Sequence, residues 1–376
     1  NPNPNPNPNP NPNPNHEPMP KPKVAFAIVV TKDGPYVDGA AVIREGVLRG
    51  CRAKYGDPEL RGSPKYDYDF IAFLLDDAVT EAMEESLKRF GWTTLRKPLP
   101  VPYEEIEDAT YREMVDKAGC CGAAEYLKLY AYAQLEYHKV VLLDMDSLVL
   151  GCLDDLFEAD ASLQFTYDMG MCSRCQKNAT LEHGGKVPPY QGGFLLVSPS
   201  MKHYDALTAI IREGDFREGG AKNAPGKKGI AWKGTRIGYY WGGRTVQGLL
   251  PYYYTVEAPG ESLEVDMCAY NNMVDNEECQ GVPVDYVQNA HFTVCQKPWK
   301  CKRWYRENQA LCEQLHDKWY ELRLEVGKEF GEPTPLYDMD TPKLKVCGPQ
   351  GKGRKGYLPV SPAFTPKLSD GRRARI

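Results

Sequence analysis

The sequence of 376 residues has an ordinary globular composition, with 42% apolar and 26% charged residues and a formal net charge of −5. This near balance of charge excludes the strongly basic surface typical of nucleic-acid-binding proteins. No apolar stretch reaches the roughly 18 residues that a membrane span needs, so we expect no span within this chain. Because the chain begins with Asn rather than Met, an upstream signal or anchor stays open.

The two ends of the chain differ in composition from its middle. Residues 1–15 alternate Asn and Pro, and Pro both lacks a backbone donor and disfavours a helical residue before it. We therefore predict that residues 1–21 form a disordered tail. Residues 331–376 are rich in Gly, Pro, Lys and Arg, which predicts a basic, solvated tail, with an anionic partner as the less favoured alternative. One domain, residues 22–330, remains between them.

Strand-like and helix-like segments alternate through this domain. Continuous apolar runs of strand length are each preceded or followed by a segment with helical spacing, which is the pattern of βαβ units with a buried, mostly parallel sheet. The predicted strands are residues 24–31, 69–75 and 139–143, and the predicted helices are residues 36–54, 80–90, 123–137 and 304–330. The sequence therefore predicts an α/β fold with helices flanking the sheet.

Two carboxylates, Asp144 and Asp146, directly follow the third predicted strand. Ligands of open α/β sheets collect at the carboxyl ends of the strands, and paired carboxylate oxygens suit Mn²⁺ or Mg²⁺. Acids that cap the next segment are the plainer alternative. A phosphatase of the haloacid dehalogenase superfamily also begins with a strand and D-x-D, but Leu148 stands where that family usually has Thr or Val, and at least two βαβ units precede this strand.

Four segments together resemble the glycogenin-like members of glycosyltransferase family 8. They carry the family's motifs in the family's order: residues 24–40, 124–157, 190–200 and 291–299. This ordered set is more specific than any single motif. The resemblance implies a GT-A fold and a metal-dependent, retaining transfer of a hexose from a nucleotide sugar, usually a UDP-sugar, to a carbohydrate or protein acceptor. Neither the acceptor nor the oligomeric state follows from it.

The resemblance also implies roles for charged side chains. Asp144, Asp146 and His291 match the family's metal ligands, and an imidazole beside two carboxylates favours Mn²⁺ over Ca²⁺. Lys297, in the K-P-W segment, matches a Lys that reaches the donor phosphate, and Lys128 matches another donor-binding Lys. A solvated helix Lys is the plainer alternative for Lys128.

Other positions are implied to hold the base and the sugar of the donor. Tyr36 matches a Tyr that stacks on uracil, and Val30 and Thr31 end the strand whose backbone approaches the base. Gly192 and Gly193 match a turn that lets the backbone approach the sugar, with Gln191 in place of the family's Asn.

Two further residues are implied to act at the sugar itself. Asp168 falls near a family Asp that binds sugar hydroxyls, and Gln247 matches a Gln below the anomeric carbon. Val246 replaces the Asp that precedes this Gln in the family, so we expect position 246 to alter donor preference. A protein that binds the nucleotide sugar without turnover is the non-enzymatic alternative.

The 12 cysteines bear on the cellular compartment. Cys172 and Cys175, and a second group of cysteines between residues 268 and 312, are compatible with disulfides or with a small zinc site. Asn178 begins a glycosylation sequon. These features favour the secretory pathway, such as the Golgi lumen. The cytoplasm remains the alternative location.

Overall fold

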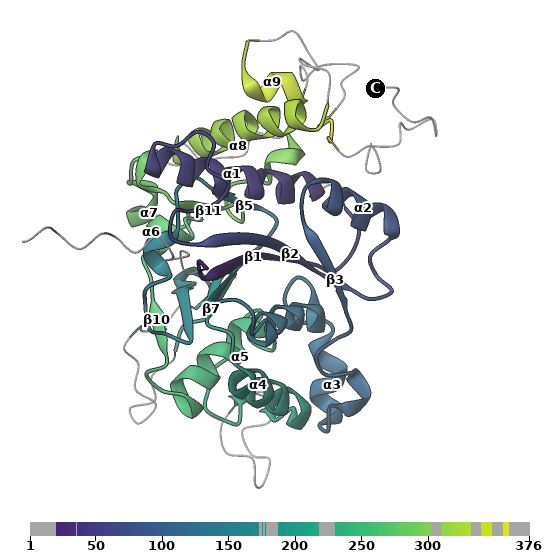
Figure 1. Cartoon of the computed structure of the whole chain (residues 1–376). Helices are drawn as coiled ribbons and strands as arrows, with labels where there is room; N and C mark the ends of the chain where they lie inside the picture. Colours follow the sequence, from purple (N-terminus) through teal and green to yellow (C-terminus); the bar gives the residue numbers. More distant parts are fainter. Residues whose placement is uncertain are drawn as a thin grey trace, which may run out of the picture.

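A seven-stranded sheet runs through the centre of the protein, with the strand order β10-β6-β7-β4-β1-β2-β3 (Figure 1). The computed structural model describes residues 20–34, 36–172, 175, 177, 187–217, 230–301, 310–331, 340–347 and 356–360. The predicted N-terminal tail up to residue 19 and the sequon at Asn178 lie outside these residues.

The strands and helices have the following bounds. The central sheet contains β1 Lys23–Val30, β2 Asp67–Leu75, β3 Thr93–Lys97, β4 Lys139–Leu143, β6 Leu163–Tyr167, β7 Tyr190–Val197 and β10 Ser262–Glu264. Two short ladders pair β5 Ser147–Val149 with β11 Asn289–His291, and β8 Phe216–Arg217 with β9 Ala231–Trp232. The helices are α1 Val37–Tyr55, α2 Glu81–Arg89, α3 Ala109–Val115, α4 Met201–Glu213, α5 Val246–Tyr252, α6 Met267–Tyr270, α7 Glu277–Gln280, α8 Ala310–Glu329 and α9 Pro342–Cys347.

The sheet changes direction beside β4. Strands β4, β1, β2 and β3 are parallel, whereas β7 runs antiparallel to both β4 and β6. Helices α1 and α8 cover one face of the sheet, and α4 and α5 lie on the other (Figure 1). Because layers lie on both faces, the central strands are apolar on both sides.

Strand β1 shows how one sequence supplies both cores. Val24, Phe26 and Ile28 join the core beneath α1 and α8, whereas Ala25 and Ala27 join the core beneath α4 and α5. Side chains alternate along a strand, so successive residues reach opposite layers. The predicted fold class is confirmed: a mixed, mostly parallel sheet flanked by helices.

The segment before β4 differs from its prediction as an α-helix. Residues Gly122–Ala133 form a 3₁₀-helix, η2, which ends before the predicted boundary at Tyr137. A 3₁₀-helix has three residues per turn. Ala123, Tyr126, Leu129 and Tyr132 follow that spacing and are all buried, so packing favours the tighter winding.

The C-terminal region was predicted to be solvated, and this is wrong for several of its described residues, although Asp340, Thr341 and Gly356 are exposed. Helix α9 packs on α8, and Val346, Tyr357 and Val360 are buried. A disulfide joins Cys347 to Cys301. Long-range contacts of this kind leave no signal in local composition, which is why the basic, Pro-rich sequence suggested solvent instead.

Asp38, in the first turn of α1, anchors this C-terminal region. Its Oδ2 accepts hydrogen bonds from the Tyr357 hydroxyl and from the Val360 backbone N–H, the latter at 2.7 Å. The fully buried Arg323 of α8 places its Nε 3.2 Å from the same oxygen and 2.8 Å from the Tyr357 hydroxyl. One buried ion pair therefore joins α1, α8 and the chain after α9.

Ten of the twelve cysteines form disulfides, and all twelve lie in the described residues. The pairs are Cys51–Cys152, Cys172–Cys175, Cys268–Cys279, Cys295–Cys312 and Cys301–Cys347. Cys120 and Cys121 remain as thiols. In the parts of the chain that the structure describes, no helix has both the length and the apolar character to cross a bilayer.

Replacement of Asp38 tests the buried ion pair. Asp38→Ala leaves the buried Arg323 guanidinium without its carboxylate, and we expect the free energy of unfolding to fall by about 3–5 kcal/mol. Arg49→Ala removes a partly exposed pair with Glu325 on the same two helices and should cost less than about 1 kcal/mol. Urea denaturation of both variants measures the difference; equal losses would show that the Asp38 pair adds nothing beyond a surface contact.

Candidate active site

The two carboxylates of the D-x-D segment lie in a tight turn between β4 and β5. The Ser147 N–H donates to the Asp144 carbonyl at 2.9 Å, which reverses the chain immediately after β4. Strand β5 then pairs antiparallel with β11, and His291 stands opposite Ser147. The Phe292 N–H donates to the Asp146 carbonyl at 2.9 Å. This short ladder is what brings His291 to the carboxylates.

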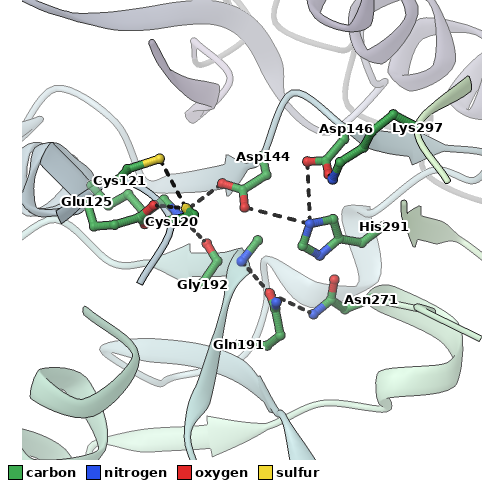
Figure 2. A network of polar contacts seen from close by, with 12 residues as sticks. Cys120, Cys121, Glu125, Asp144, Asp146, Gln191, Gly192, Asn271, His291 and Lys297 are labelled. Carbon is green, nitrogen blue, oxygen red and sulfur yellow. Dashed lines mark hydrogen bonds and ion pairs between the residues drawn. The ribbon is translucent and has the colours of Figure 1, made fainter. Parts of the chain in front are cut away.

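Asp144, Asp146 and His291 form a cluster that fits a divalent cation. Ligand atoms of the three side chains all lie within 4.8 Å of one another. His291 Nε2 is 3.4 Å from Asp146 Oδ1 and 3.7 Å from Asp144 Oδ2 (Figure 2). Such separations suit ligands that share one cation at about 2.0–2.2 Å each. The residues therefore satisfy the expected chemistry of a metal site.

The state of His291 supports this fit. The imidazole is buried, and its Nδ1 has no hydrogen-bond partner among the described residues. Its Nε2 is too far from either carboxylate for a short hydrogen bond. Burial lowers the pKa of His291, and the neighbouring Asp144 opposes this only in part. The neutral imidazole is therefore favoured, which is the form that binds a metal.

Two lysines neutralise the carboxylates from opposite sides. Lys128, on η2, is almost fully buried; its Nζ lies 2.9 Å from Asp144 Oδ1 and 2.8 Å from Glu125 Oε2, and it donates to the Gly192 carbonyl at 2.9 Å. Lys297 pairs with Asp146. Burial by itself lowers the pKa of Lys128, but Asp144 and Glu125 outweigh it, so the pKa lies above its ordinary value. A fully solvated Lys128 is thereby excluded.

Burial raises the pKa of Asp144, but its positive neighbours have the larger combined effect. Lys128 leads these neighbours and Lys297 adds to its effect, so the pKa of Asp144 is lowered overall. The half-buried carboxylate therefore stays ionised, as a ligand for a hard cation requires.

The cluster opens into a cavity of about 390 Å³. Its wall includes ten of the predicted site residues: Thr31, Tyr36, Lys128, Asp144, Asp146, Gly192, Gly193, Gln247, His291 and Lys297. Val30 is fully buried and is not part of the wall, where Val29 takes its place. A larger hollow beside α2, of about 740 Å³, is lined by Glu84, Lys88 and Arg96, which already pair with one another.

Position 193 requires glycine because there is no space for a side chain. A Cβ there would lie 2.2 Å from His291 Cε1. The neighbouring Gln191 points inward: its Oε1 accepts the Gly193 N–H and lies 3.4 Å from Asn271 Nδ2, which also donates to Thr166 (Figure 2). Gln191, Gly192 and Gly193 lie in strand β7 and not in a turn as expected, and Gln191, which replaces the family's Asn, thus holds the strand backbone at Gly193.

Besides Val30, two further positions that the sequence singled out lie away from the cavity wall. Asp168 is buried, its carboxylate faces Asp275 across Gly170, and it does not line the cavity. Val246 is fully buried in the core beneath α4 and α5, whereas Gln247 lines the cavity. The expectation that Val246 faces the sugar is therefore wrong, because the first residue of α5 turns into the core. An Asp at that position would bury a carboxylate.

Sequence reasoning missed several residues of the wall. Cys120, Cys121 and Glu125 lie beside Lys128, and Trp241 and Trp299 also line the cavity. Glu125 stands three residues before Lys128, a helical spacing for an ion pair that offered a usable signal. Trp299 belongs to the K-P-W segment itself. Trp241 lies in a glycine-rich loop without a periodic pattern, so nothing local marked it.

Comparisons with known proteins agree with the motifs. No family model matches the chain. Over 207 residues it is 24% identical to galactinol synthase 7 from Arabidopsis thaliana, covering 50% of this chain and 55% of that protein. The chain is similar to glycosyltransferases. It spans about half the length of this curated relative.

Two solved structures illustrate the likeness. The bifunctional glycosyltransferase WbbM matches with a TM-score of 0.47 and 13% identity, over 83% of this chain and 52% of that chain. The galactosyltransferase LgtC, solved with donor and acceptor sugar analogues, matches with a TM-score of 0.46 and 15% identity, over 80% of this chain and 95% of that chain.

The buried Asp168 predicts a pH-dependent cost to stability. Burial and the neighbouring Asp275 raise its pKa to about 6. The folded protein therefore keeps a proton that the unfolded chain releases near pH 4, so this group lowers stability as the pH rises from about 4 to about 6. Asp168→Asn should raise the free energy of unfolding by up to about 3 kcal/mol at pH 7 and leave it unchanged at pH 3.5. Denaturation at both pH values, with the exposed Asp205→Asn as control, measures this; a gain of equal size at both would contradict it.

Proposed function

We propose that this protein is a metal-dependent glycosyltransferase that moves a hexose from a UDP-sugar to an acceptor. The cluster of Asp144, Asp146 and His291 at the carboxyl end of β4, facing a cavity flanked by Lys128 and Lys297, carries this proposal. The sequence resemblance supports it, and galactinol synthase 7 makes UDP-galactose a reasonable donor to test beside UDP-glucose.

The charged residues would bind the diphosphate of the donor. Asp144, Asp146 and His291 would hold Mn²⁺ or Mg²⁺, which when bound supplies positive charge to a departing diphosphate. Lys297 lies beside Asp146 at the cavity wall and would present its ammonium group to the phosphate oxygens. Lys128 is committed to Asp144 and Glu125, so it would chiefly orient Asp144.

The remaining wall would accept the base and the sugar. Tyr36 and Thr31 line the side of the cavity at the end of β1, where an aromatic ring can stack on a base. Gly192 lines the cavity and would let a sugar approach the backbone, whereas the His291 imidazole fills the space beside Gly193. Gln247 would lie near the anomeric carbon, and transfer with retention would follow if the leaving diphosphate accepts the acceptor's proton.

We also propose a cellular compartment for this protein. Five disulfides favour an oxidising compartment, such as the Golgi lumen, over the cytoplasm. Free thiols at these ten positions in protein from its native source would move it to a reducing compartment.

One screen separates the proposal from its alternatives. Incubation with a panel of nucleotide sugars should release the nucleoside diphosphate in a metal-dependent way. A phosphatase would release inorganic phosphate from simple esters, and a non-catalytic binding protein would bind the donor without releasing anything.

Removal of the metal should abolish this activity. Excess chelator should stop nucleoside diphosphate release, Mn²⁺ should restore it best, and Asp146→Asn should lower turnover at least 100-fold because one ligand is lost. Circular dichroism should show a retained fold. Asp155→Asn, on the exposed turn after β5, serves as the matched control and should keep its activity. Full activity in excess chelator would refute the metal assignment.

Replacement of Tyr36 tests base stacking. Tyr36→Ala should weaken UDP binding by about 1 kcal/mol, roughly fivefold, because the ring is lost. Tyr36→Phe keeps the ring and loses only the hydroxyl that donates to the Lys32 carbonyl, so its affinity should stay close to that of wild type. Titration calorimetry with UDP and Mn²⁺ compares the three proteins; equal losses in both variants would indicate a hydroxyl contact instead.

A further inference from the structure

Two adjacent thiols lie in the wall of the cavity. Cys120 and Cys121 are the cysteines outside the five disulfides, and Cys120 is exposed. Their Sγ atoms are 3.1 Å apart, on the same side of the chain. Gly119 and Gly122 flank the pair with φ of +63° and +60°, values that favour glycine and that shape the turn before η2.

The pair is connected to the metal-site carboxylates by a chain of contacts. The Cys120 thiol donates to Glu125 Oε1 at 3.1 Å, and Glu125 Oε2 lies 2.8 Å from Lys128 Nζ (Figure 2). Lys128 in turn pairs with Asp144 at 2.9 Å. Thr31, which directly follows β1, lines the same cavity as Cys121. The thiols therefore contact the charged side of the cavity and share its wall with residues of the predicted base side.

We propose that Cys120 and Cys121 are a modification site, at which a low-molecular-weight disulfide reversibly converts the dithiol to a vicinal disulfide and weakens nucleotide binding. This inference rests on the proposed function. A thiolate of Cys121 attacks one sulfur of the disulfide RSSR and releases RS⁻, which takes up a proton. Cys120, as thiolate, then attacks Cys121 Sγ in the mixed disulfide, closes the ring and releases the second RS⁻. The net change is two protein thiols and RSSR to one ring disulfide and two RSH.

The choice of Cys121 as the first nucleophile follows from the contact between the thiols. The contact with Cys120 lowers the pKa of the Cys121 thiol, whereas that contact, burial and the Glu125 carboxylate raise the pKa of the Cys120 thiol. A disulfide between neighbours joins Cα atoms only about 3.8 Å apart, below the usual range, and such bonds are more readily reduced. That property suits a reversible change.

Oxidation would disturb the cavity in two ways. The Cys120 S–H donor to Glu125 disappears, so Glu125 competes more strongly with Asp144 for Lys128. The ring also changes the backbone at the start of η2, which carries both Glu125 and Lys128. Both effects act on residues beside the phosphate end of the cavity.

Mass spectrometry combined with binding tests the proposal. The full chain is treated with oxidised glutathione, and peptide mapping should show the loss of two hydrogens on the peptide that contains both cysteines. The dissociation constant for UDP with Mn²⁺, from calorimetry, should rise at least tenfold, and Mn²⁺ affinity alone, from electron paramagnetic resonance, gives a second readout. Mild reduction that leaves the other five disulfides intact should restore both.

Serine variants of the two cysteines show whether the ring disulfide causes the loss of UDP binding. In Cys120→Ser, the mixed disulfide should accumulate on Cys121, because the second attack is impossible. In the double variant Cys120→Ser and Cys121→Ser, the dissociation constant for UDP with Mn²⁺ should be the same with and without oxidised glutathione. Failure to form the ring, or a ring that leaves both affinities unchanged, would overturn the proposal. If the reduced protein binds neither UDP nor Mn²⁺, the proposed function itself fails and the switch falls with it.

Discussion

Mutual neutralisation of buried charges is the condition on which the cavity depends. Asp144 stays ionised at a half-buried position because the Lys128 ammonium group lies beside it, and the buried Lys128 stays charged because Asp144 and Glu125 flank it. Removal of one partner from such a set leaves an uncompensated charge, which costs far more than a surface pair contributes. The positions of β4, η2 and β7 are therefore constrained by charge as well as by packing, since Lys128 also holds the Gly192 carbonyl.

Much of the fold could be predicted because its signals are local. The apolar runs of β1, β2 and β4 mark strands buried on both faces, and Thr80 accepts the Met83 N–H as the N-cap of α2 at the predicted boundary. The winding of η2 could not be predicted from an amphipathic pattern, because the same apolar residues fit both three and 3.6 residues per turn. The packing of Tyr357 against Asp38 depends on residues far apart in the chain, and composition does not record such contacts.

In the candidate site, too, the residues with local sequence signals could be predicted and the others could not. Asp144 and Asp146 could be identified from their place after a strand, whereas His291 needed the surrounding motif because a lone histidine carries little information. Val246 shows the limit of transfer by motif: its neighbour Gln247 reaches the cavity, but the first residue of α5 faces the core. Backbone direction at the start of a helix decides this, and sequence similarity alone does not give it.

The ladder between β5 and β11 has a consequence for synthesis of the chain. An N-terminal fragment that ends after β7 would contain β1, β2, β4 and the D-x-D turn, and yet would lack the imidazole that β11 delivers. The pairing of β5 with β11 closes a long loop of chain between them, which costs entropy and slows folding relative to local contacts. A nascent chain would thus emerge from the ribosome with two carboxylates and Lys128 already made, and would acquire its third ligand only when the last third of the domain has been translated. Cation affinity would therefore report completed folding and not the presence of the sheet.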